Sequence, residues 1–128
     1  MKKTILIVDD EVCIHKILEL TLGKDYCLIV KHNGLEALIW LEEGNYPALI
    51  ICDLEMPYID GESLIKNLKI SEQYRDVPII LISGAEKVES VVKQMVHKPN
   101  CFFKKPFDTR ELKSCVIISC LNQEFSKL

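Results

Sequence analysis

The feature that most constrains this chain is a regular alternation of short apolar runs with longer segments that are apolar on one side only. The runs are rich in Ile, Leu and Val and show no polar alternation, which is typical of strands that are buried on both faces. They occupy residues 4–8, 26–30, 48–52, 77–82 and 101–103. We therefore predict five strands inside a parallel sheet.

The intervening segments carry apolar residues at helical spacing, and several of them open with capping residues. We expect helices to begin near residues 12, 33, 60, 87 and 108. A regular alternation of strands and helices predicts a doubly wound α/β sandwich with right-handed crossovers. The length of 128 residues suits one domain over residues 1–128. In such folds, ligands bind beyond the carboxyl ends of the strands.

Charge and hydropathy exclude several functional classes. The net charge of −3 argues against binding nucleic acid or an anionic membrane through charge. No apolar run is long enough to cross a bilayer, and we find no secretory signal. The six cysteines form no Cys-x-x-Cys pair and have no zinc-finger spacing, so we expect reduced thiols, buried in the case of Cys27, Cys52 and Cys101. These features favour a cytoplasmic protein.

Polar residues follow four of the five predicted strands directly. They are Asp9-Asp10-Glu11, then Asp53 with Glu55, then Ser83-Gly84, and finally Lys104-Lys105-Pro106-Phe107. A parallel sheet would bring these loops to one edge, where several carboxylates would need a compensating cation. Mg²⁺ prefers oxygen ligands and is typically bound by one or two carboxylates plus a phosphate, and an ammonium group would add a second positive charge. The sequence thus predicts an acidic Mg²⁺ site near Lys105.

In this order and at this spacing, the four segments resemble the receiver domain of bacterial two-component response regulators, including chemotaxis regulators. The resemblance covers nearly the whole chain and includes the longer motif Asp53-Leu-Glu-Met-Pro57-x-x-Asp60-Gly61. It implies a flavodoxin-like α/β fold, in which a doubly wound five-stranded parallel sheet of order 2-1-3-4-5 is covered by five helices.

The resemblance also implies a role for each matching residue. Asp53 would be the phosphorylation site, Lys105 and Ser83 would bind phosphoryl oxygens, and Ser83 would act with Phe102 in a conformational switch. The Mg²⁺ ligands would be Asp9, Asp10, Asp53 and the backbone carbonyl of Glu55. The Lys105–Pro106 peptide bond would be cis.

The function that follows is a phosphoacceptor switch in a two-component system or phosphorelay, rather than an enzyme. Asp53 would accept a phosphoryl group from the phosphohistidine of a sensor histidine kinase or a phosphotransfer protein. A face formed by the fourth and fifth helices and the fifth strand would then bind a downstream protein or an output domain, without direct contact with nucleic acid or membrane.

Two alternatives remain open from the sequence. One is a degenerate receiver that is used only for protein contacts, and the other is a phosphatase with an aspartyl-phosphate intermediate. The chain also departs from the family pattern at Lys98-Pro99, where receivers usually have Gly-Ala. Because a residue before proline avoids helical geometry, we expect the fourth helix to end early, near Val96. His15 lies near the rim of the site and would be structural or would touch a partner.

Overall fold

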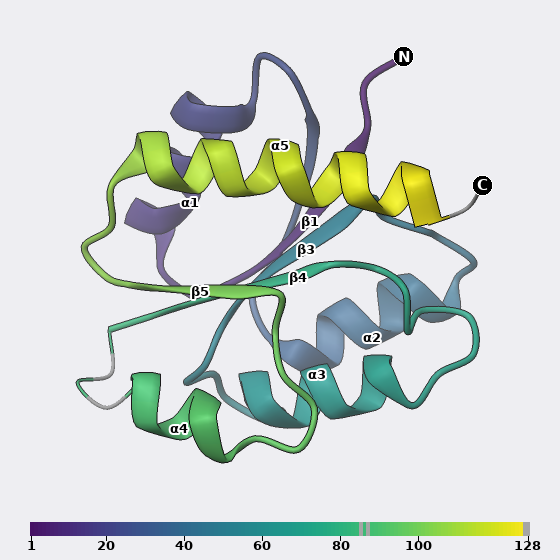
Figure 1. The fold of residues 1–128 in the computed structure, drawn as a ribbon, viewed down its shortest axis with the longest axis vertical. Coiled ribbons are helices and arrows are strands. Elements are labelled where there is room, and N and C mark those ends of the chain that lie inside the picture. The colour runs from purple at the N-terminus through teal and green to yellow at the C-terminus, as the bar shows by residue number, and fades with distance from the viewer. Residues whose placement is uncertain (85, 87, 127–128) are drawn as a thin grey trace.

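A single parallel sheet organises the chain in the computed structural model, which describes residues 1–84, 86 and 88–126 (Figure 1). Its five strands lie in the order β2-β1-β3-β4-β5, so the predicted flavodoxin-like fold is confirmed. All four neighbouring pairs of strands are parallel. The strands are β1 (Thr4–Val8), β2 (Cys27–Lys31), β3 (Leu49–Asp53), β4 (Ile79–Ser83) and β5 (Cys101–Lys104).

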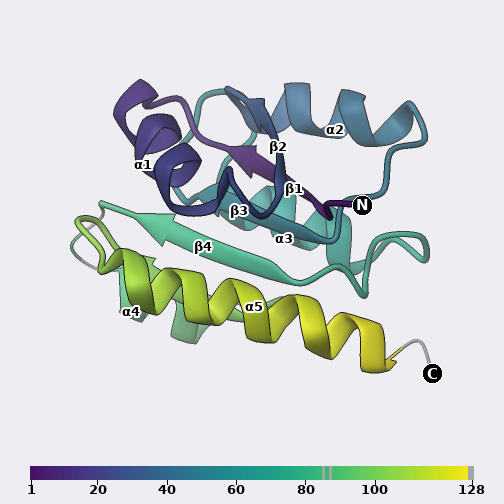
Figure 2. The ribbon, with the colours of Figure 1, turned by 90° about the horizontal axis from the view of Figure 1, so that it is seen from above.

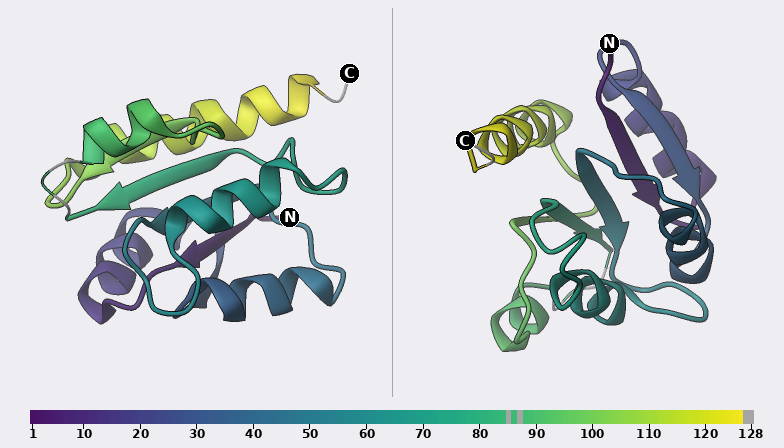
Figure 3. Two further views of the ribbon diagram at one scale, coloured as in Figure 1. Left: turned by 90° about the horizontal axis from the view of Figure 1, so that it is seen from below. Right: turned by 90° about the vertical axis from the view of Figure 1, so that its right-hand side faces the viewer.

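Helices cover both faces of this sheet. In the described part of the chain they are α1 (Val12–Leu22), α2 (Gly34–Glu42), α3 (Gly61–Lys69), α4 (Val88–Gln94) and α5 (Thr109–Ser126). Figures 2 and 3 show α1 and α5 on one side of the sheet and α2, α3 and α4 on the other. None of the described helices has the length and apolarity that a transmembrane helix requires.

The two faces of the sheet hold two separate apolar cores, and this explains why the strands are apolar throughout. Successive side chains of a strand point to opposite faces. Ile5 and Ile7 pack with α1 and α5, whereas Leu6 and Val8 pack with α2, α3 and α4. Each fully buried Ile or Leu contributes about 1.5–3 kcal/mol through burial. A polar residue at any of these positions would face one core or the other.

The start of two helices follows from capping side chains that are visible in the sequence. The side chain of Asn33 accepts a hydrogen bond from the Glu36 N–H at 2.9 Å, and that of Asp60 accepts one from the Ser63 N–H at 2.8 Å. These bonds satisfy N–H groups that have no partner within the helix. The predicted beginnings of α2 and α3 are confirmed.

The end of α4 comes even earlier than the predicted Val96. The helix ends at Gln94, and the ammonium group of Lys98 donates hydrogen bonds to the carbonyls of Val92 and Lys93, both at 2.8 Å. A lysine side chain thus satisfies carbonyls that a glycine-based turn would otherwise satisfy. The predicted start of this helix at Lys87 lies outside the described residues.

The prediction of reduced thiols is wrong for two of the cysteines. Cys101 at the start of β5 and Cys115 in α5 are joined by a disulfide. Cys52 is buried as expected, but Cys27 is exposed because it lies on the edge strand β2. The apolar run around Cys101 indicated a strand but contained no information about which helix would pack above it.

Candidate functional site

The strand register brings the polar residues that follow the strands to one edge of the sheet. Val8 of β1 lies opposite Cys52 of β3, so the next residues, Asp9 and Asp53, are neighbours across the two strands. This is the place in the sheet where the strand order reverses, and it is where ligands bind in open α/β folds.

Asp9 is buried, and hydrogen bonds hold it in place. Its side chain is 1% exposed. One carboxylate oxygen, Oδ1, accepts a hydrogen bond from the Glu11 N–H at 2.9 Å, and Oδ2 accepts one from the ammonium of Lys105 at 3.0 Å. The Asp9 N–H donates to the carbonyl of Lys31, the last residue of β2, at 3.1 Å.

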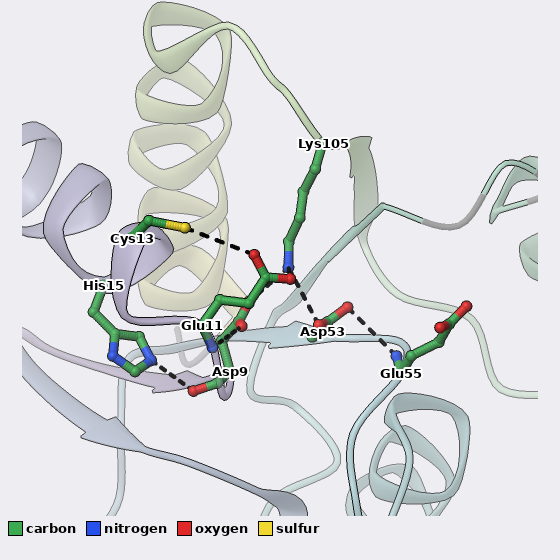
Figure 4. A network of polar contacts seen from close by, with 7 residues as sticks. All are labelled: Asp9, Glu11, Cys13, His15, Asp53, Glu55 and Lys105. Carbon is green, nitrogen blue, oxygen red and sulfur yellow. Dashed lines mark hydrogen bonds and ion pairs between the residues drawn. The ribbon is translucent and has the colours of Figure 1, made fainter.

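Asp53 is the last residue of β3, and its side chain is 6% exposed. The Glu55 N–H donates to its Oδ1 at 3.4 Å, while the Glu55 carboxylate points away from it (Figure 4). The start of α3 lies directly against this strand end, because a Cβ atom on Gly61 would collide with the Asp53 carbonyl and lie 2.8 Å from the Leu54 Cα. Only glycine fits at this position.

Lys105 connects the carboxylates (Figure 4). It follows β5, and its backbone N–H donates to the Ser83 carbonyl at 2.7 Å, which anchors it beside the end of β4. The ammonium nitrogen lies 3.0 Å from Asp9, 3.2 Å from Asp53 and 3.3 Å from Glu11. The Lys105–Pro106 peptide bond is cis, as expected.

The site contains several carboxylates and one ammonium group, and this imbalance, together with burial, shifts the pKa values of Asp53 and Lys105. Burial raises the pKa of Asp53 above its usual value, Lys105 opposes this effect, and the charge of Asp9 adds to it. Burial alone would lower the pKa of Lys105, but its hydrogen bonds and ion pairs with Asp9 and Asp53 outweigh burial and raise that pKa. One ammonium therefore does not neutralise the cluster, and the site favours a further cation.

The donor set fits Mg²⁺. Asp9, Asp10, Glu11 and Asp53 offer carboxylate oxygens that all lie within 4.8 Å of one another. Asp9 and Asp53 are buried, and Asp10 and Glu11 are exposed. A cation bound here would therefore contact carboxylates that burial holds in place and would also be accessible to water. Hard oxygen ligands with retained water are what Mg²⁺ requires in proteins.

The two predicted switch residues lie on the neighbouring strands β4 and β5. Ser83 ends β4 and is 1% exposed, and its strand partner is Lys104, which immediately precedes Lys105. Phe102 lies on β5, opposite Leu81, and is 37% exposed, so its ring lies outward in this structure.

Two residues that the sequence reasoning did not assign to the site also contact it. Glu11 precedes α1 as its N-cap residue, yet its carboxylate makes no capping bond and binds Lys105 instead. His15, which we expected to be structural or to touch a partner, has its Nε2 2.6 Å from the Asp9 carbonyl oxygen. The sequence places Glu11 among the acidic residues after the first predicted strand and His15 near the rim of the site, but it indicates neither contact.

Comparisons with known proteins agree with this geometry. Residues 5–117 match the family model of the response regulator receiver domain. The chain is 35% identical over 114 residues to the protein named "Probable transcriptional regulator ycf27" of Porphyra purpurea. The aligned region covers 88% of this chain and 45% of that protein. The chain is 32% identical over 112 residues to the uncharacterized transcriptional regulatory protein YkoG of Bacillus subtilis, covering 87% and 48% respectively. The chain thus spans less than half the length of these curated relatives.

Among solved structures, the chain is similar to the signal receiver domain of a signal transduction histidine kinase from Syntrophus aciditrophicus. The two superpose with a TM-score of 0.85 at 30% sequence identity, covering 94% of this chain and 91% of the other.

Proposed function

The chain belongs to the family of response regulator receiver domains, and from that membership we propose that it is a phosphoacceptor switch that takes up a phosphoryl group on Asp53. The observation that carries this proposal is the position of Lys105, whose ammonium lies 3.2 Å from Asp53 and 3.0 Å from Asp9 although the three residues are far apart in the chain. We further propose that residues 1–128 form a single receiver domain.

The chemistry follows from the proposed nucleophile. A carboxylate oxygen of Asp53 attacks the phosphorus of a phosphohistidine, the P–N bond breaks, and the released imidazole takes up a proton. The product is an acyl phosphate on Asp53. Such transfers depend on positioning and on neutralising charge. Mg²⁺, when bound, supplies much of that neutralisation, and we propose that Asp9, Asp10, Asp53 and the Glu55 carbonyl hold it.

The residues of this chain would contribute position and charge. The Glu55 N–H restrains Asp53 at one carboxylate oxygen. Lys105, now paired with Asp53, would instead bind an oxygen of the incoming phosphoryl group as a point charge. Because the nearby carboxyl groups are buried, this charge acts in an environment with little screening.

We propose that the phosphoryl group is detected through Ser83 and Phe102. The backbone of Ser83 is fixed to Lys105, so its hydroxyl would reach a phosphoryl oxygen from the adjacent strand end. Phe102 would then turn from its present exposed position toward the space beside β4. With no hydroxyl on its ring, Phe102 would be held there by packing alone.

We propose a sensor histidine kinase or a phosphotransfer protein as the donor. The receiving partner would be a downstream protein or an output domain, bound at the face of α4, β5 and α5. On this proposal the chain acts in the cytoplasm, without touching nucleic acid or membrane itself, and is not an enzyme with a separate substrate.

Acetyl phosphate tests the proposal without knowledge of the kinase. Incubated with Mg²⁺, the protein should gain the mass of one phosphoryl group, and the gain should disappear in Asp53→Asn and when Mg²⁺ is chelated. Asp76→Asn, which alters an exposed aspartate in the loop before β4, serves as the matched control and should still be phosphorylated.

Two other results would refute the proposal. Absence of both phosphorylation and Mg²⁺ binding would indicate a degenerate receiver that is used only for protein contacts. Rapid multiple turnover of organic phosphates would indicate a phosphatase.

A further inference from the structure

We propose that His15 is a positioning residue, which fixes the Asp9–Asp10 segment for cation binding by holding the main-chain carbonyl of Asp9. This inference rests on the proposed function, because it assigns a role within the same Mg²⁺ site. His15 contacts neither Asp53 nor Lys105 in any interaction that the structure shows among the described residues, so its effect would pass through Asp9.

The contact itself is short and has only one chemical interpretation. The Nε2 atom of His15 lies 2.6 Å from the Asp9 carbonyl oxygen (Figure 4). A carbonyl oxygen only accepts hydrogen bonds, so Nε2 must carry the proton and donate it. The ring reaches back from the first turns of α1 across the loop that connects β1 to the helix, and it is half-buried there.

This bond completes the restraint of Asp9. Its N–H is bound by Lys31, one carboxylate oxygen by the Glu11 N–H and the other by Lys105. The carbonyl is the remaining polar group, and His15 binds it.

The consequence reaches Asp10, which is one of the proposed Mg²⁺ ligands. The peptide unit between Asp9 and Asp10 is planar, so fixing the Asp9 carbonyl also fixes the direction in which the chain enters Asp10. The Asp10 side chain is exposed and is not held by burial. The orientation of its backbone is therefore an important determinant of where its carboxylate lies.

The ring of His15 is itself supported from the side. The ring of His32 meets it edge-on, with 5.6 Å between the ring centroids and 72° between the planes. Glu36 in turn holds His32, with its carboxylate oxygen 3.4 Å from the His32 N–H and 3.5 Å from Nδ1. Glu36 is anchored by the Asn33 cap at the start of α2. Residues after β2 thus contact the His15 ring from the side.

The experiment compares His15→Phe, which keeps a ring but has no donor, with His15→Gln, whose amide nitrogen lies at a similar distance along the side chain. Isothermal titration with MgCl₂ alone gives the dissociation constant of each unphosphorylated protein. We expect about tenfold weaker Mg²⁺ binding in His15→Phe, at the lower end of the range that is typical of outer-shell effects at metal sites. His15→Gln should lie within about twofold of the wild type. His97→Phe, in the loop between α4 and β5, is the control and should not change the affinity.

The rate of phosphorylation by acetyl phosphate separates positioning from general damage. In His15→Phe the Mg²⁺ concentration that gives half the maximal rate should rise in parallel with the dissociation constant, while the rate at saturating Mg²⁺ recovers. Loss of the maximal rate with unchanged Mg²⁺ affinity would overturn the inference, and so would a His15→Gln protein as impaired as His15→Phe.

A measurement on the unaltered protein keeps the inference testable if a variant does not fold. The imidazole ¹⁵N spectrum should show His15 protonated at Nε2, and a ring protonated only at Nδ1 would refute the proposed bond.

The proposed function and the proposed role of His15 can be refuted independently of each other. A wild-type protein that binds Mg²⁺ but takes up no phosphoryl group refutes the proposed function alone, whereas a phosphorylated wild type with a His15→Phe variant of equal Mg²⁺ affinity refutes the role of His15 alone.

Discussion

Replacing the proposed phosphoacceptor by its neutral counterpart, Asp53→Asn, should make the metal-free protein more stable. The buried carboxylates of Asp53 and Asp9 offer oxygens within 4.8 Å of each other, and at an effective dielectric constant near 20 two unit charges at that distance repel by about 3.5 kcal/mol. The same treatment gives an attraction of about 5 kcal/mol for Lys105, 3.2 Å from Asp53. Removing the Asp53 carboxylate from water on folding adds an unfavourable free energy of several kcal/mol to the repulsion from Asp9. The balance favours the neutral amide over the carboxylate by about 1–2 kcal/mol, because Lys105 keeps its contacts with Asp9 and Glu11.

The pH dependence has the sign expected for a carboxyl group whose pKa is raised by folding. The native state then holds the Asp53 proton more tightly than the unfolded chain does, so its contribution to stability falls as the pH rises from the unfolded pKa through the native pKa. The advantage of the variant should therefore be complete at neutral pH. It should vanish below the ordinary aspartate pKa of about 4.

Urea and thermal unfolding, followed by circular dichroism in EDTA, provide the measurement. A gain of about 1–2 kcal/mol in a domain of this size corresponds to about 4–8 °C in melting temperature. Added Mg²⁺ should stabilise the wild type more than the variant and so reduce the gap. The exposed control Asp76→Asn should change the free energy of unfolding by less than about 0.5 kcal/mol. A variant that is less stable than the wild type at neutral pH without divalent cations would refute the reasoning, since the pairing with Lys105 would then outweigh burial and repulsion.

Four further predictions concern other parts of the molecule. Lys105→Met should lower the free energy of unfolding by about 3 kcal/mol at neutral pH, because it leaves buried carboxylates uncompensated. Urea titrations at a series of pH values should show the difference in stability between wild type and variant decreasing as the pH rises through the raised Lys105 pKa. Gly61→Ala should cost about 2–3 kcal/mol by forcing α3 away from the Asp53 carbonyl, and should slow phosphorylation in the acetyl phosphate assay. Tyr58→Gly should stabilise the protein by about 1 kcal/mol in urea, because Tyr58 is 82% exposed and has a φ of 69°. Alkylation without reductant, followed by peptide mass analysis, should leave Cys101 and Cys115 unlabelled and linked, and two labelled residues would contradict the disulfide.

The strands could be predicted from the sequence because burial on both faces of a parallel sheet leaves a strong signal. Residues 4–8 were predicted and observed without a shift, whereas β2 and β3 each begin one residue later than predicted. The order of the strands in the sheet could not be predicted from the apolar runs. Apolar runs do not specify their neighbours, and the order 2-1-3-4-5 came from the resemblance to receiver domains.

The predicted positions of the site residues followed from the same logic, since residues after parallel strands meet at one edge. What the sequence did not contain was the direction of individual side chains. Glu11 looks like an ordinary acidic residue at a helix start, and only the structure shows it turned toward Lys105. The disulfide depends on how α5 packs over β5, a tertiary distance that no local pattern encodes. The roles of Asp9, Asp10, Asp53, Ser83 and Lys105 in phosphoryl transfer remain predictions for the experiments above.

The way the acidic cluster is assembled has a consequence for how this domain folds. Its carboxylates lie at the ends of β1 and β3, which are neighbours in the sheet, whereas Lys105 follows β5, with β4 between β3 and β5. All four carboxylates therefore lie in the first half of the chain, and only the compensating ammonium comes from the second half. Mg²⁺ binding during refolding would therefore report the pairing of β1 with β3, which does not require β4 and β5 to be in place.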